Sequence, residues 1–92
     1  GREECFLLKI RGDSMEDANI TEGDYVLIER CQTARSRDIV AVALGDEATL
    51  KRLMQMGDTI LLVPENAKYE PIQVRSDQIN VLGKVIGVLK KQ

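Results

Sequence analysis

The 92-residue sequence contains no histidine. This absence excludes a Ser-His-Asp or Cys-His catalytic site, a histidine-ligated metal and a histidine proton shuttle within the chain. Any hydrolytic chemistry that these residues perform must therefore use lysine, aspartate or glutamate as its general base.

Cysteine is also scarce, since Cys5 and Cys31 are the only two. They form no CxxC pair and no histidine accompanies them, which excludes structural zinc and favours two free thiols over a disulfide. The longest uncharged apolar run, residues 60–64, is far shorter than a membrane span. No secretion signal is visible at the start of the sequence. We therefore expect a cytoplasmic protein with no membrane partner, no cofactor and no metal.

The charge balance limits the partners further. The 13 lysines and arginines are scattered among 15 acidic residues, and the formal net charge is -2. Because nucleic-acid binding needs clustered basic residues that neutralise phosphates, this chain is not expected to bind DNA by itself. Any contact with DNA would be made by another domain. The length and the 43% of hydrophobic residues fit one globular domain with one site.

Alternating apolar residues and closely spaced turns predict a mostly β domain. One segment is ambiguous, because Leu50, Leu53 and Met54 would also fit one face of a helix. Seven residues between glycine turns are too few for a helix, so we interpret it as a strand. The predicted strands span residues 6–11, 25–28, 39–44, 48–54, 59–63 and 80–89, with a loop over residues 64–71.

Ser14 follows the first predicted strand at a tight turn. Residues 14–17 have the form of a capping box, with Ser14 capping a short helical turn that ends near Ile20. A hydroxyl at such a turn can also act as a nucleophile beside converging backbone N–H groups, which suit an oxyanion hole. The local sequence leaves both roles open, although capping serines are much commoner than nucleophiles.

Lys51 lies inside an apolar segment, on the same face of the predicted strand as Thr49 and Leu53. A solvated lysine has a pKa near 10.4 and is a poor base at neutral pH. Burial would lower that pKa and make the neutral amine available to deprotonate a serine hydroxyl. The alternative is that Lys51 is a solvated strand residue, with Arg52 as its charged neighbour on the opposite face.

Seven segments of the sequence, taken together and in this order, resemble the LexA peptidase family, which includes UmuD proteins and phage repressors. The resemblance runs from about Phe6 to Leu89. The segments are Gly12–Met15, Asn19–Asp24, Asp38–Ala41, Glu47–Leu53, Leu62–Asn66, Tyr69–Ile72 and Gly83–Gly87.

This resemblance implies a single domain over residues 1–92, with twisted LexA/signal-peptidase-like β-sheets, a small barrel-like core and one short helical turn. It also implies that Ser14 attacks a peptide bond and that Lys51 takes the proton from its hydroxyl. The backbone N–H groups of Asp13 and Ser14 would hold the oxyanion. Because Thr49 lies two residues before Lys51 on the same face, we expect it to orient the amine.

The resemblance further implies the self-cleaving serine peptidase domain of an SOS-response repressor. Such a protein forms homodimers, for which residues 81–89 are the candidate surface, and RecA filaments on single-stranded DNA promote its cleavage. The bond that it cuts is Ala-Gly or Cys-Gly in its own upstream segment, beyond which lies a DNA-binding domain. Neither dipeptide occurs in these 92 residues. We therefore expect either a longer protein or a peptidase that acts on a substrate supplied in trans.

Two alternatives remain open at this point. The first is a UmuD-like accessory subunit of a translesion polymerase, which would carry a short upstream arm in place of a DNA-binding domain. The second is a noncatalytic dimerisation module, in which Ser14 caps a helix and Lys51 is solvated.

Overall fold

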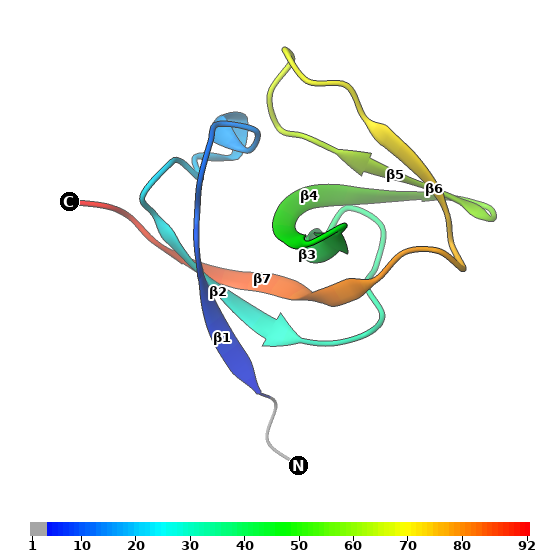
Figure 1. Cartoon of the computed structure of the whole chain (residues 1–92), viewed down its shortest axis with the longest axis horizontal. Coiled ribbons are helices and arrows are strands. Elements are labelled where there is room, and N and C mark those ends of the chain that lie inside the picture. The colour runs from blue at the N-terminus through cyan, green and yellow to red at the C-terminus, as the bar shows by residue number, and fades with distance from the viewer. Residues whose placement is uncertain (1–3) are drawn as a thin grey trace.

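The structure is a computed structural model that describes residues 4–92, and within this range seven strands form one antiparallel sheet (Figure 1). The strand order is β1-β2-β7-β3-β4-β5-β6, and the edge strands β1 and β6 do not pair with each other, so the sheet is open. The strands are β1 (Cys5–Lys9), β2 (Tyr25–Arg30), β3 (Ile39–Leu44), β4 (Glu47–Met56), β5 (Thr59–Val63), β6 (Ile72–Arg75) and β7 (Val81–Leu89).

The mostly β fold with one short helical turn is confirmed. The helical element among residues 4–92 is the 3-10 helix η1 (Glu16–Ala18), and none of the described helical residues form a helix long and apolar enough to cross a membrane. The ambiguous segment over residues 48–54 is a strand, the middle of β4. Strand β6 is missing from the strands expected from the sequence.

The core consists of two groups of buried side chains, because the central strands β3 and β4 bury residues on both faces. On β3, Ala41 belongs to one group, whereas Val40 and Val42 belong to the other. The first cluster contains Ile10, Met15, Ile20, Val26, Ile28, Ala41 and Leu50, and the second contains Val40, Val42, Leu53, Ile60 and Leu62. Strand β4 contributes Leu50 to the first cluster and Leu53 to the second. Both faces of this strand therefore pack in an apolar environment.

Strands β2 and β7 approach each other closely at Gly83. A Cβ atom at this position would collide with the backbone carbonyl oxygen of Glu29 and with the side chain of Ile28. At Gly87, further along β7, the nearest atom to an added Cβ would be 3.8 Å away, which is an ordinary contact. The packing of β7 on β2 therefore requires glycine at position 83 and tolerates a side chain at position 87.

A buried carboxylate ties the end of the chain to the turn before β2. Asp24 is fully buried, and its side chain accepts hydrogen bonds from the Lys91 backbone N–H at 2.8 Å and the Thr21 backbone N–H at 2.8 Å. It also forms an ion pair with Lys90. The Lys90 ammonium and these N–H donors hold the pKa of Asp24 well below its usual range. Asp24 is therefore charged in the folded protein.

Candidate active site

Ser14 lies on the loop that connects β1 to η1. The loop turns at Gly12, whose φ of 77° is in the left-handed region, and the Gly12 N–H donates to Glu22 Oε1 at 2.7 Å. On the other side of Ser14, the side chain of Met15 is buried in the first cluster. The serine is thus held between a glycine turn and a residue anchored in the core.

The alternative in which Ser14 caps a helix is wrong. The N-cap of η1 is Met15, and it makes no side-chain capping hydrogen bond. In a capping box the Ser14 hydroxyl would accept a hydrogen bond from the Asp17 N–H, but that N–H donates instead to the Glu65 carbonyl at 2.7 Å. The Asp17 N–H is thus bonded to Glu65, which is distant in the sequence, and the Ser14 hydroxyl has no capping role.

At Asp13 and Ser14 both backbone carbonyl groups are bonded, whereas neither backbone N–H group has an acceptor among residues 4–92. The Asp13 carbonyl accepts from the Glu16 N–H at 3.2 Å, and the Ser14 carbonyl accepts from the Glu65 N–H at 2.8 Å. Among the hydrogen bonds within residues 4–92, none uses the N–H of Asp13 or Ser14 as donor. Two free N–H groups beside a hydroxyl are what an oxyanion hole requires.

Lys51 is buried on β4, with 7% of its surface exposed, so the alternative of a solvated lysine is wrong. It pairs with Val40 across the β3–β4 ladder, which places both side chains on the face of the second cluster. Its Nζ donates to Thr49 Oγ1 at 3.0 Å and to the Leu50 carbonyl at 3.0 Å. The expected contact between Thr49 and the amine is therefore present.

The charge state of Lys51 follows from this burial. Within the described residues, no carboxylate lies within salt-bridge distance of its ammonium. Desolvation then acts without a compensating negative charge and lowers the pKa of Lys51 below its ordinary value. The neutral amine is correspondingly easier to form, as a general base requires.

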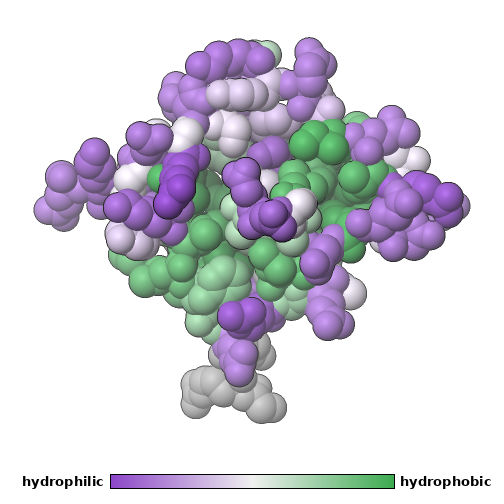
Figure 2. Space-filling model, in the orientation of Figure 1, coloured by the Kyte–Doolittle hydropathy of each residue, from purple (hydrophilic) through white to green (hydrophobic). Residues whose placement is uncertain are grey.

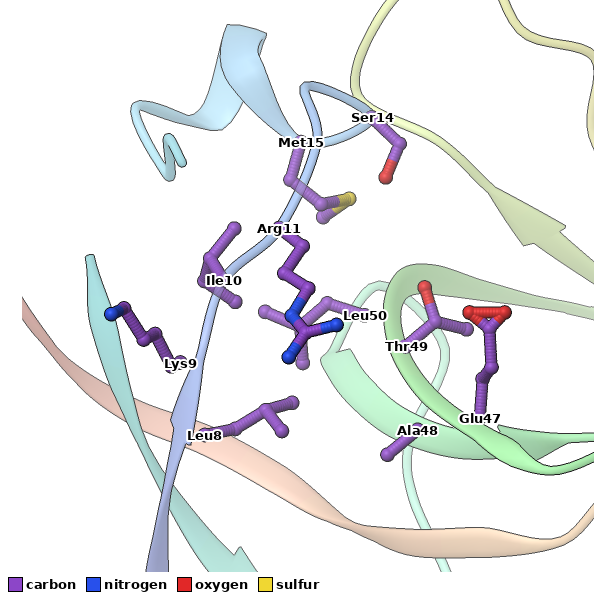
Figure 3. Close-up of a pocket in the computed structure, with 10 residues that line it drawn as sticks. All are labelled: Leu8, Lys9, Ile10, Arg11, Ser14, Met15, Glu47, Ala48, Thr49 and Leu50. Carbon is purple, nitrogen blue, oxygen red and sulfur yellow. The ribbon is translucent and has the colours of Figure 1, made fainter. Parts of the chain in front are cut away.

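A groove of about 460 Å³ lies between the Ser14 loop and β4 (Figure 3). Ser14 and Thr49 both line it, and Figure 3 shows their hydroxyl groups directed toward each other from opposite sides. Lys51 does not itself line the groove and is connected to it through Thr49, whose Oγ1 accepts the hydrogen bond from Nζ. The remaining lining residues are Leu8, Lys9, Ile10, Arg11, Met15, Glu47, Ala48 and Leu50.

The loop between β5 and β6 packs on the Ser14 loop, a contact that the sequence did not predict. In addition to the two Glu65 backbone bonds, Asn66 Nδ2 donates to the Asp13 carbonyl at 2.9 Å. Lys68 forms an ion pair with the Asp13 carboxylate at 2.6 Å, and the Tyr69 hydroxyl donates to the same carboxylate. These two contacts lower the pKa of Asp13. The family motifs at Leu62–Asn66 and Tyr69–Ile72 mark this segment, although they do not reveal what it contacts.

The two cysteines take no part in this arrangement. Cys5 is an exposed free thiol on β1, and Cys31 is a half-buried free thiol just after β2. In the part of the chain from residue 4 onward, no three histidine, cysteine, aspartate or glutamate side chains group in a way that could hold a metal ion.

Comparisons with known proteins place this arrangement in a family context. A family model described as Peptidase S24-like matches residues 1–86. The chain is 48% identical over 92 residues to the LexA repressor of Koribacter versatilis, a match that covers 99% of this chain and 44% of the relative. It is 50% identical over 88 residues to the LexA repressor of Magnetococcus marinus, with 95% and 38% covered. The chain therefore spans less than half the length of these curated relatives.

Proposed function

The chain belongs to the peptidase S24-like family, and from that membership we propose that it is the self-cleaving serine peptidase domain of a LexA-type repressor. In this proposal Ser14 is the nucleophile and Lys51 is the general base. The observation that carries it is Lys51 itself, a buried amine without a counter-ion, linked by one hydrogen bond to a residue that shares a groove with Ser14.

A neutral amine at Lys51 could make both of the hydrogen bonds that its Nζ forms. A neutral amine has two N–H donors and one lone pair, whereas an ammonium has three donors and no lone pair. The two acceptors found, Thr49 Oγ1 and the Leu50 carbonyl, satisfy both N–H groups. The lone pair then remains available to take a proton from Ser14. Thr49 orients the amine in this scheme and does not itself react.

The proposed reaction follows from these positions. Lys51 removes the Ser14 hydroxyl proton as Oγ attacks the carbonyl carbon of the substrate peptide. The N–H groups of Asp13 and Ser14 stabilise the negative charge on the carbonyl oxygen. Lys51 then passes the proton to the leaving amine, and water hydrolyses the resulting acyl-enzyme. A peptide segment that docks in the groove would also complete the desolvation of Lys51.

The noncatalytic alternative required Ser14 to cap a helix and Lys51 to be solvated. Neither residue has that role, since Met15 is the N-cap and Lys51 is buried. Burial of a charged amine without a counter-ion destabilises the folded state. A domain with only a structural role would gain nothing that offsets this cost. The structure therefore favours the peptidase over the dimerisation module.

The test is cleavage in trans. The chain is mixed at mildly alkaline pH with a peptide that carries an Ala-Gly bond between apolar residues. We expect slow cleavage that is lost in Ser14→Ala and Lys51→Ala and kept in Lys84→Ala, a half-exposed lysine of β7 that serves as the matched control. Cleavage that persists in folded Lys51→Ala would refute the assignment of the base.

We also propose that the domain forms a homodimer through the outer surface of β1, β2 and β7, where Figure 2 shows hydrophobic residues gathered. Large apolar side chains are exposed there, and a solvent-facing apolar patch marks an interface. They are Leu7, Tyr25, Ile86 and Leu89. Sedimentation equilibrium should give a dimer for the unmodified chain and a monomer for Leu89→Glu. A monomeric wild-type chain at high concentration would contradict this part of the proposal.

The regulatory partners are proposed from the relatives, which are named repressors. A repressor acts where the genome is, so we propose a cytoplasmic location and an operator bound through a separate DNA-binding domain. RecA filaments on single-stranded DNA would promote cleavage by favouring the state in which the cleavage segment is docked. Addition of such filaments to the repressor that contains this domain should accelerate cleavage, and an unchanged rate would contradict the RecA proposal.

A further inference from the structure

The loop between β5 and β6 makes contacts that bear on the chemistry of Ser14. Four of its residues bond to the Ser14 loop, but only Asn66 reaches the Asp13 carbonyl with its side chain, at 2.9 Å from Nδ2. The other end of the same amide is also bonded, because Asn66 Oδ1 accepts from the Lys68 N–H at 3.1 Å. Both ends of the Asn66 side chain are thus fixed, and its donor is directed at one peptide group.

That peptide group contains the N–H that the proposed mechanism needs. The Asp13 carbonyl and the Ser14 N–H belong to the same planar peptide unit, which is trans, as are the other peptide bonds of the described residues. In a trans peptide the C=O and N–H bonds point in opposite directions. A carbonyl directed at Asn66, on the side of the β5–β6 loop, therefore directs the Ser14 N–H away from that loop.

The same loop holds the next peptide unit in the same way. The Ser14 carbonyl accepts from the Glu65 N–H, and the Asp17 N–H donates to the Glu65 carbonyl. The loop itself is attached to β4, because the Arg52 guanidinium forms an ion pair with Glu65 at 2.8 Å. Arg52 is the residue next to Lys51. These contacts fix the orientation of the Ser14 backbone relative to β4, the strand that carries Lys51.

We propose that Asn66 is a positioning residue for the oxyanion hole: its side-chain amide holds the Asp13 carbonyl and thereby directs the Ser14 N–H into the groove. This inference rests on the proposed function, since it assigns Asn66 a part in the chemistry of Ser14. Asn66 does not touch the substrate in this scheme. Its loss should therefore lower the rate of the reaction at Ser14 without changing the protonation of Lys51.

The experiment measures how fast Ser14 reacts with an alkyl fluorophosphonate. In that reaction the Ser14 Oγ–P bond forms, the P–F bond breaks and fluoride leaves, while the hydroxyl proton passes to the base. The phosphoryl oxygen then occupies the oxyanion hole. Rate constants are measured against pH for the wild-type chain, Asn66→Ala and Asn66→Asp, and mass spectrometry locates the modified residue. Thermal unfolding of each variant shows whether it is folded at the assay temperature.

The matched control is Asp38→Ala. The Asp38 side chain also bonds to the backbone of its own loop, accepting from the Arg35 N–H at 2.9 Å. Among residues 4–92, no hydrogen bond joins it to the Ser14 loop. Outright loss of one oxyanion donor costs about 100- to 1000-fold in rate. For a misdirected donor we expect a loss of about 10-fold or more in both Asn66 variants, with the pH midpoint unchanged. Asp38→Ala should stay within about twofold of the wild-type rate, because no oxyanion donor depends on it.

The outcomes separate this inference from the function on which it rests. Folded Asn66 variants that react at the wild-type rate would overturn the role of Asn66 and leave Ser14 and Lys51 as proposed. A wild-type chain that is not modified at Ser14 would overturn the proposed function, and the role of Asn66 with it. If neither Asn66 variant folds, the wild-type adduct decides: the Ser14 amide proton must move downfield in the NMR spectrum as it bonds the phosphoryl oxygen. An unchanged Ser14 resonance would overturn the inference.

Discussion

Replacing Lys51 with methionine should change how the stability of the domain depends on pH. The pKa of the buried amine lies below its ordinary value of 10.5 because it is desolvated. Between the folded-state pKa and the unfolded-state value, the unfolded chain therefore binds more protons than the folded chain. Under that condition the free energy of unfolding rises with pH. Lys51→Met removes the titrating group while keeping a side chain of similar length, so it should remove this rise.

The magnitude follows from proton linkage. One proton that is bound only in the unfolded state gives a slope of about 1.4 kcal/mol per pH unit. The stability of Lys51→Met relative to wild type should be greatest at pH values below the folded-state pKa, where wild type buries a full charge. The difference should decline through the window and become constant above about pH 10.4, where the unfolded lysine is also neutral.

Methionine also leaves two acceptors without their donor, namely Thr49 Oγ1 and the Leu50 carbonyl. Each lost hydrogen bond costs about 1 kcal/mol, and this cost does not depend on pH. It shifts the whole difference curve downward without changing its slope. The slope, rather than the stability at any single pH, is therefore the quantity that tests the burial of a charge at position 51.

The assay is urea unfolding followed by far-UV circular dichroism at pH values from neutral to strongly alkaline. Lys84→Met is the control, since the Lys84 side chain is 44% exposed beside Glu29. Subtracting the wild-type curve cancels the titration of all groups that the proteins share. Wild-type and Lys51→Met curves that run parallel across the alkaline range would refute the argument, because Lys51 would then titrate alike in the folded and unfolded chains.

Three further predictions concern single positions. Gly83→Ala should destabilise the domain strongly, because its Cβ would meet a backbone carbonyl of β2, whereas Gly87→Ala should leave the thermal midpoint within a few degrees; equal midpoints would contradict the close approach. Asp24→Asn should lower the thermal midpoint at neutral pH, and the difference from wild type should shrink as pH falls below about 4, because the depressed pKa of Asp24 stabilises the fold only while it is ionised. Thr49→Val should slow cleavage of the trans peptide by at least about 10-fold while the domain stays folded, since it removes one acceptor that orients the amine.

The fold could be predicted from the sequence wherever one strand has a clear period and a clear boundary. Six strands and the short helical turn lie where alternation and glycine turns indicate them. Strand β6 could not be found in this way, because only Val74 among its four residues is even partly buried. Its hydrogen bonds to β5, with Leu62 paired to Ile72, are what make it a strand. A short edge strand with so little burial carries almost no periodic signal.

The roles of Ser14 and Lys51 could not be decided from local sequence, because distant segments determine both environments. The capping box does not form, because the Asp17 N–H bonds to Glu65, which belongs to a loop far along the chain. The burial of Lys51 depends on the partner strand, where Val40 lies opposite it. The family resemblance pointed to both residues because it compares whole segments in order, and so reflects tertiary contacts that a local pattern omits.

The order Lys51-Arg52 on β4 explains how a buried amine remains without a counter-ion although its neighbour Arg52 binds the carboxylate of Glu65. Successive side chains of a strand point to opposite faces, so the side chains of Lys51 and Arg52 are separated by the sheet itself. Glu65 lies on the Arg52 side, where its carboxylate accepts from Nε at 3.2 Å and from Nη2 at 2.8 Å. A carboxylate beside Lys51 would instead raise the pKa of the amine and keep it protonated. Arg52 thus does two things at once: it anchors the loop that positions Ser14, and it keeps the carboxylate of that loop on the face opposite the base.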